Sequence, residues 1–137
     1  MTSTILRSTA AAIAFAGALA LATPSMAAMM NFKASLSGKS EVPANTTAGS
    51  GSVTATYDTD SKKLTWKGSY SGLTGPATAA HFHGPAAEGK NAGNGPSFEG
   101  SATLTDAQAK ALMDGDMYVN VHTVTNKGGE IRGQLTK

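Results

Sequence analysis

Hydrophobic and polar residues alternate along most of the chain after Asn31. Alternation with a period of two places one face of a β-strand on a core and the other face toward water. The apolar members of the pattern are Phe32, Ala34 and Leu36; Val53, Ala55 and Tyr57; Leu64, Trp66 and Tyr70; Ala80 and Phe82; Phe98, Ala102 and Leu104; Met117, Val119 and Val121; and Ile131 and Leu135. The pattern therefore predicts a series of short strands, each with one buried face.

Turn-forming residues separate these runs, at 58–60, 72–76, 84–85, 91–96 and 126–129. Frequent turns between short alternating segments are typical of all-β sandwiches and barrels. We therefore predict an all-β domain, a Greek-key or immunoglobulin-like β-sandwich of about seven or eight short strands.

One segment departs from the alternation and predicts a short helix. Thr105 and Gln108 have the spacing of a capping box, and the residues from Ala109 to Met113 continue a helical pattern. Gly115 then provides a stop signal. We expect a helix of about two turns here.

The first 27 residues have the features of a secretory signal peptide. Arg7 precedes an unbroken run of apolar or small residues from Ala10 to Ala22, and small residues precede a cleavage site after Ala27. The run is shorter than the roughly 18 apolar residues that span a bilayer. We expect residues 1–27 to be removed and residues 28–137 to form one exported domain, periplasmic or secreted, without a membrane span.

Composition and charge exclude several classes of function. The chain has 137 residues, no cysteine, a net charge of +2 and scattered basic residues, which argues against a nucleic-acid partner. A disulfide scaffold, a zinc ribbon and a cysteine nucleophile are all excluded. The sequence has neither a phosphate-binding glycine loop nor a G-x-S-x-G elbow. An enzymatic activity stays open, and a non-catalytic role is favoured.

All three histidines fall in two strand-like segments. His81 and His83 flank Phe82, so an inward Phe82 places both imidazoles on the opposite face of one strand. Val119 and Val121 similarly place Asn120 and His122 outward. If the two strands are neighbours, three imidazoles meet, a ligand set that suits Zn(II) or Cu(II), with copper the tighter binder. The alternative is three unrelated, half-exposed histidines on a sheet surface.

Three further residues are candidates to support such a site. An inward Ile131 would place Glu130 and Arg132 together on the outer face, and a hairpin would bring them beside the His122 strand. Asn120 and Glu130 could then hold the ligands in place, and Arg132 could supply positive potential. The interpretation that we favour for Glu130 and Arg132 is an exposed pair on the sheet surface.

Several short stretches form a recognisable series along the chain: Phe32 to Leu36, Ser37-Gly38, Glu41-Val42-Pro43, Leu64-Thr65-Trp66, Tyr70 to Gly75, Ala79 to Ala86, Tyr118 to Thr123 and Gly129 to Leu135. Through these stretches the chain resembles the CHRD (chordin) domain family over nearly all of residues 28–137. The resemblance implies a single β-rich domain and little about activity, although members occur outside cells.

A fainter resemblance bears on chemistry. In Cu/Zn superoxide dismutases, copper is held by an H-x-H strand pair and a later strand histidine, with an arginine farther on. The order His81, His83, His122, Arg132 is similar to that copper half-site. The histidine that bridges copper and zinc, the zinc subloop and the disulfide have no counterparts here.

Two hypotheses of different classes follow. The leading one is an exported CHRD protein that binds a copper-like ion, with zinc as the alternative, for metal binding, trafficking or protection; superoxide-type chemistry is subordinate. The other is a metal-free recognition or structural module that binds a protein or cell-surface partner through the Gly84–Pro96 loop or a sheet edge.

Overall fold

The computed structural model describes residues 26–84 and 97–137 and contains seven strands and one α-helix there. The predicted signal peptide, apart from its last two residues, and most of the Gly84–Pro96 loop lie outside the described residues. The elements are β1 (Met29–Ser37), the 3-10 helix η1 (Gly38–Ser40), β2 (Ser50–Asp58), β3 (Lys63–Ser71), β4 (Ala77–His83), β5 (Ser97–Thr103), α1 (Asp106–Asp114), β6 (Tyr118–Thr123) and β7 (Ile131–Gln134).

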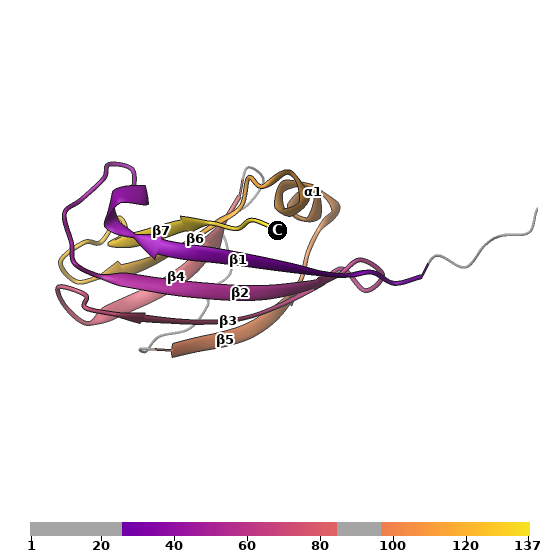
Figure 1. The fold of residues 1–137 in the computed structure, drawn as a ribbon, viewed down its shortest axis with the longest axis horizontal. Coiled ribbons are helices and arrows are strands. Elements are labelled where there is room, and N and C mark those ends of the chain that lie inside the picture. Colours follow the sequence, from indigo (N-terminus) through magenta and orange to yellow (C-terminus); the bar gives the residue numbers. More distant parts are fainter. Residues whose placement is uncertain (1–25, 85–96) are drawn as a thin grey trace, which may run out of the picture.

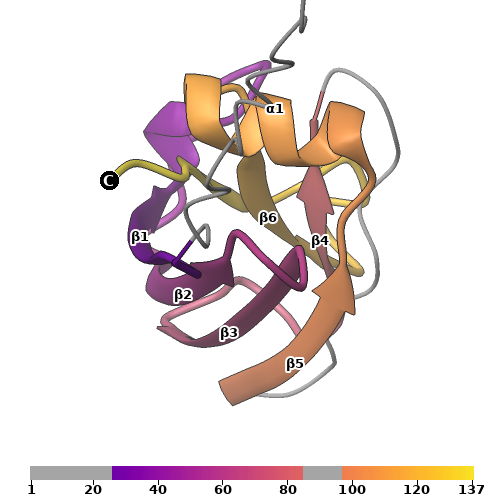
Figure 2. The same ribbon diagram turned by 90° about the vertical axis from the view of Figure 1, so that its right-hand side faces the viewer.

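The strands form one antiparallel sheet in the order β4-β6-β7-β1-β2-β3-β5. The sheet curls so that the β4-β6 end faces the β2-β3 region (Figures 1 and 2). Trp66 of β3 and Phe82 of β4 meet across this interior, with ring centroids 4.7 Å apart. The all-β prediction is therefore confirmed, and the two layers expected of a sandwich are the two halves of one curled sheet.

The two halves are joined at a narrow seam between β1 and β7. Ser37 pairs with Arg132, and an isolated bridge joins Lys33 to Thr136 through backbone hydrogen bonds of 2.8 and 2.9 Å. Gly133 lies at this seam, where a Cβ atom would come within 2.2 Å of the Ser35 carbonyl oxygen. Only glycine therefore allows the two strands to approach so closely.

The core is built from the alternating residues that the sequence pattern singled out. All of them are buried except Tyr70 and Ala102, which are partly buried against the same cluster. The inward-facing residues of β4 and β6 belong to this core, so the other residues of both strands must face outward. This alternation positions the histidines.

Helix α1 begins and ends as the sequence predicts. Thr105 and Gln108 form a capping box in which each side chain bonds the other's backbone, and Gly115 ends the helix in the left-handed conformation. Leu112 on this helix is fully buried in the core. Among the described residues, no helix is long and apolar enough to cross a membrane.

Candidate metal centre

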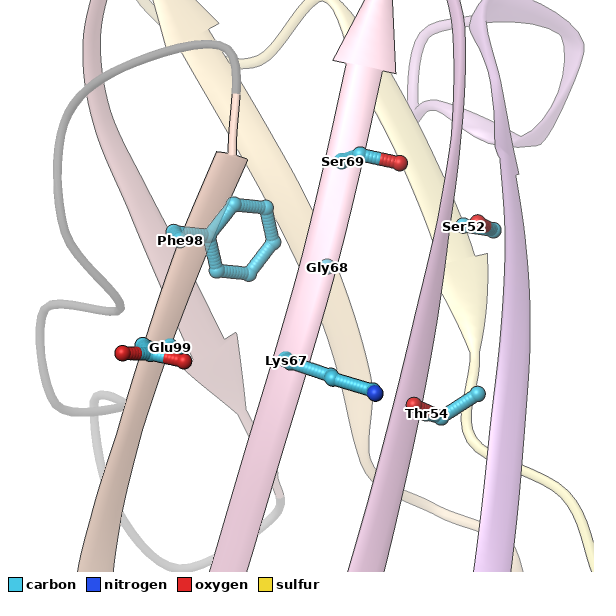
Figure 3. A pocket seen from close by; sticks show the side chains of 7 residues that line it. All are labelled: Ser52, Thr54, Lys67, Gly68, Ser69, Phe98 and Glu99. Atoms are coloured by element: carbon cyan, nitrogen blue, oxygen red, sulfur yellow. The ribbon is translucent and has the colours of Figure 1, made fainter.

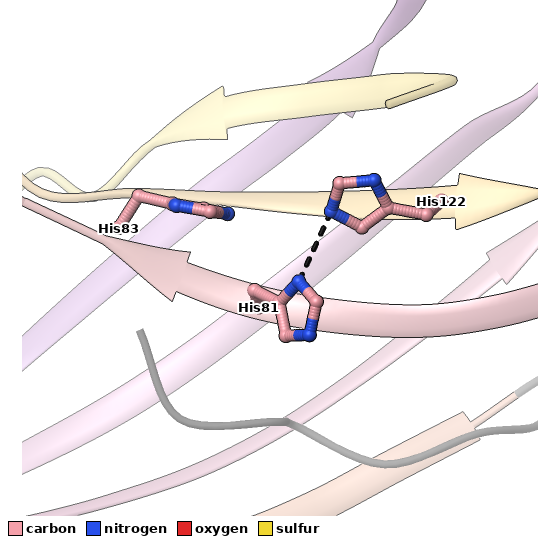
Figure 4. Close-up of side chains that lie close together, drawn as sticks. All are labelled: His81, His83 and His122. Carbon is pink, nitrogen blue, oxygen red and sulfur yellow. Dashed lines mark hydrogen bonds between the residues drawn. The ribbon is translucent and has the colours of Figure 1, made fainter. Parts of the chain in front are cut away.

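The histidines come from β4 and β6, which are adjacent antiparallel strands. In the register of this pair, His81 lies opposite Asn120 and His83 opposite Tyr118, while His122 lies opposite Ala79. All three imidazoles therefore project from one outer face, as Figure 4 shows. The condition that the sequence left open, that the two histidine-bearing strands are neighbours, is met in the structure.

The three imidazoles form one compact, half-buried group. One nitrogen from each of His81, His83 and His122 lies within 4.8 Å of the other two. The Nδ1 atom of His81 and the Nε2 atom of His122 are only 3.1 Å apart and form a hydrogen bond (Figure 4). A metal ion could take the place of the hydrogen in that bond without a large movement of either ring.

A backbone carbonyl holds the His122 ring in one tautomer. Its Nδ1 atom lies 2.9 Å from the carbonyl oxygen of Lys127 in the β6–β7 turn. A carbonyl oxygen only accepts hydrogen bonds, so Nδ1 carries the hydrogen and Nε2 carries the lone pair that faces His81. Histidine ligands of metals are commonly oriented by such a bond through their other nitrogen.

Asn120 holds the ring of His83 in a similar way. Its Oδ1 atom lies 3.0 Å from His83 Nε2 and accepts a hydrogen bond from it. The His83 ring also stacks on Tyr118, with centroids 4.9 Å apart and an interplanar angle of 13°. Asn120, which the sequence placed beside the histidines, is thus brought against one of them, although its side chain is buried.

Arg132 lies next to this group, on β7. Its guanidinium carbon is 3.5 Å from the centroid of the Tyr118 ring, a cation–π contact. Tyr118 on β6 therefore contacts His83 from β4 and Arg132 from β7. The structure brings Arg132 close to the histidines through this tyrosine, as a positive neighbour rather than as one half of an ion pair with Glu130.

Glu130 is not on the outer face, so the expectation that it forms an exposed pair with Arg132 is wrong. It precedes β7, in a turn where Gly129 has a φ of 132°, so the alternation within the strand does not extend to it. Its side chain is fully buried. The carboxylate accepts hydrogen bonds from Thr47, Thr74, Thr123 and Asn126.

These bonds decide the charge of Glu130. Burial raises the pKa of its carboxyl, but the hydrogen bonds from Thr47, Thr123 and Thr74 outweigh burial and lower the pKa to about 2. The charged carboxylate of Glu130 therefore links the β6–β7 turn to the loops at Thr47 and Thr74 by hydrogen bonds. Its described contacts do not include the histidines.

Glu41 is a buried acid near the histidines that the sequence pattern did not single out. This residue follows η1, is only 7% exposed and lies in electrostatic range of Arg132 and His122. Burial raises the pKa of its carboxyl, while Arg132, His122 and Asn120 favour the charged form. The only sequence signal was its place in Glu41-Val42-Pro43, one of the stretches that carry the family resemblance.

A hollow of about 630 Å³ lies elsewhere, on the outer surface of the other half of the sheet (Figure 3). It is lined by short hydroxyl side chains together with Lys67, Glu99 and part of Phe98. None of the histidines borders it, so the two features are separate.

Comparison with known proteins supplies the family. The CHRD domain model matches residues 32–135, which include every strand from β2 to β7 and all three histidines. This chain belongs to the CHRD domain family. CHRD domains are of a type found in extracellular or exported proteins. No curated protein and no solved structure matches the chain, so the likeness to a dismutase copper half-site rests on residue order alone.

Proposed function

We propose that this CHRD domain binds one transition-metal ion, copper foremost and zinc as the alternative, through His81, His83 and His122. The observation that supports this most is the convergence of three imidazole nitrogens within 4.8 Å of one another. Nitrogens that share an ion at about 2.0–2.1 Å lie about 3–4 Å apart, so small ring rotations complete the site. Its expected setting is outside the cytoplasm, in the periplasm or secreted.

The chemistry of the ligand set favours copper and zinc over harder ions. Imidazole nitrogens suit both metals, whereas Mg²⁺ and Ca²⁺ prefer oxygen ligands. At equal geometry Cu(II) binds more tightly than the other divalent first-row metals. Three protein ligands leave at least one coordination position open for water or another ligand, an arrangement compatible with binding, trafficking or protection.

Support from surrounding groups strengthens the proposal. His122 bonds the Lys127 carbonyl and His83 bonds the Asn120 amide, so each of these two rings is already oriented by a hydrogen bond from one of its nitrogens. Three unrelated surface histidines need no such partners. Loss of an outer partner of this kind typically weakens metal binding about 10–100-fold.

The test is a copper titration of the purified metal-free protein by calorimetry, with paramagnetic resonance on the copper form. We expect one site with nitrogen hyperfine structure. His83→Ala should weaken binding by more than the roughly 10–100-fold that an outer partner contributes. Lys127→Ala is the matched control, because it removes an exposed side chain and keeps the carbonyl that holds His122.

Equal affinity in wild type and His83→Ala would contradict the ligand set. An absence of binding in the wild type would reject the proposal itself. The domain would then be a metal-free recognition or structural module, to be studied through its protein or cell-surface partners.

A further inference from the structure

Glu41 is a buried acid beside the histidines that the proposed ligand set does not use. Its Oε1 atom forms no hydrogen bond with any part of the chain that the structure describes. Taking a carboxylate oxygen out of water without a partner is unfavourable, and such groups call for an explanation.

The carboxylate of Glu41 lies against the amino end of the Asn120 amide. A Cβ atom on Gly129 would be 2.5 Å from Glu41 Oε1 and 2.7 Å from Asn120 Nδ2, so both atoms crowd the same glycine. Asn120 Nδ2 also approaches the Gly128 carbonyl oxygen at 3.5 Å. Two acceptors, one of them charged when Glu41 is ionised, therefore surround the amino group.

This arrangement determines which end of the amide faces His83. If the amide were reversed, its oxygen would lie against the Glu41 carboxylate and the Gly128 carbonyl, and acceptor would face acceptor. In the observed orientation, Oδ1 faces His83 Nε2 at 3.0 Å. Because an amide oxygen cannot donate, His83 keeps its hydrogen on Nε2 and its lone pair on Nδ1.

We propose that Glu41 is a positioning residue that, through Asn120, selects the His83 tautomer whose Nδ1 atom can bind a metal ion. The inference rests on the proposed function where it concerns metal. The tautomer itself exists without metal, so the two proposals can fail separately.

The first experiment measures the tautomer in the metal-free protein. Long-range ¹H–¹⁵N nuclear magnetic resonance, at a pH where imidazole is neutral, should show His83 with its hydrogen on Nε2 alone. Glu41→Gln should give a mixture of tautomers, because a glutamine can offer Asn120 either an oxygen or an amino group. Glu99→Gln, an exposed acid on β5, should leave the spectrum unchanged.

The second experiment measures copper binding by the same variants. Glu41→Gln should lower the affinity about 10–100-fold and alter the nitrogen hyperfine pattern, whereas Glu99→Gln should do neither. If Glu41→Gln does not fold, Glu41→Asp tests the contact in place of the charge: it keeps the carboxylate but withdraws it from Asn120 by one methylene, so a mixture of tautomers is again expected.

Each combination of results has a definite meaning. A mixture of His83 tautomers in the wild type, or an unchanged tautomer in Glu41→Gln, overturns the positioning role. This holds even if copper affinity falls, because the charge of Glu41 would then act on the copper ion directly and not through the tautomer of His83. A tautomer change in a protein that binds no metal supports the role of Glu41 and rejects the proposed function. Changes in both measurements support both proposals.

Discussion

The Nδ1 atom of His81 lies 3.1 Å from the Nε2 atom of His122, although 41 residues separate the two histidines in the chain. The register of β4 and β6 brings them together. His122 also donates to the Lys127 carbonyl, so its ring is held from both sides. The hydrogen bond between His81 and His122 marks the place where the proposed metal ion would bind.

Zinc binding at this place should stabilise the fold. A ligand present at about 100 times its Kd adds about 2.7 kcal/mol to the free energy of unfolding. We expect zinc to raise the melting temperature of the wild type and of Lys127→Ala, and to have little effect on His122→Ala. The measurement is thermal unfolding followed by circular dichroism. An equal zinc-dependent rise in His122→Ala would show that the ion binds elsewhere.

Glu130 should make stability depend on acid pH. Its folded-state pKa is lowered from 4.5 to about 2, so its contribution is fully present above the unfolded-state pKa and is lost as pH falls through the folded-state pKa. The contribution is roughly 3 kcal/mol at neutral pH. Glu130→Gln should lose most of it and show a flatter stability profile between these two pKa values.

Denaturant unfolding over a series of pH values checks this expectation. Glu99→Gln is the control, because it makes the same change of charge at an exposed position on β5. If the free energy of unfolding changed with pH in the same way in wild type and Glu130→Gln, the Glu130 carboxylate would not be stabilising the fold in its charged form, as its five hydrogen bonds indicate that it does.

The seam between β1 and β7 should not accept a side chain at Gly133. A Cβ atom there would lie 2.2 Å from the Ser35 carbonyl oxygen, which belongs to rigid backbone. Overpacking of this kind costs about 1–3 kcal/mol, and backbone contact places Gly133→Ala at the upper end. Gly128→Ala is the matched control, because nothing lies within 4 Å of its Cβ position.

Chemical denaturation of the two alanine variants compares them directly. If Gly133→Ala and Gly128→Ala had the same free energy of unfolding, the β1 and β7 backbones could separate enough at Gly133 to accept a Cβ atom. A lower value for Gly133→Ala alone confirms that the two halves of the sheet depend on this close approach.

The sequence was most informative where structure repeats locally. Because side chains alternate along any strand, an inward Phe82 was enough to place His81 and His83 outward, and the same holds for Val121 and His122. The capping box at Thr105 predicted the helix start for the same reason: its partners are three residues apart.

The sequence was least informative where burial depends on distant partners. Glu130 lies outside its strand and is bonded to Thr47, 83 residues away, so no local period reports its burial. Glu41 lies in a segment without alternation, and its neighbours at Asn120 and Gly129 come from the far end of the chain. Charged residues in such segments look like ordinary solvent-exposed loop residues until the fold is known.

The seam between β1 and β7 also has a kinetic consequence. The first and last strands of the domain are neighbours, so the sheet cannot close until nearly the whole chain is available. All-β domains dominated by pairings between distant segments fold in milliseconds to seconds, because the entropy of closing long loops is lost before the contacts form. Strand β1 therefore lacks its β7 neighbour until the last strand has been synthesised, and the two halves of the sheet cannot be joined before then.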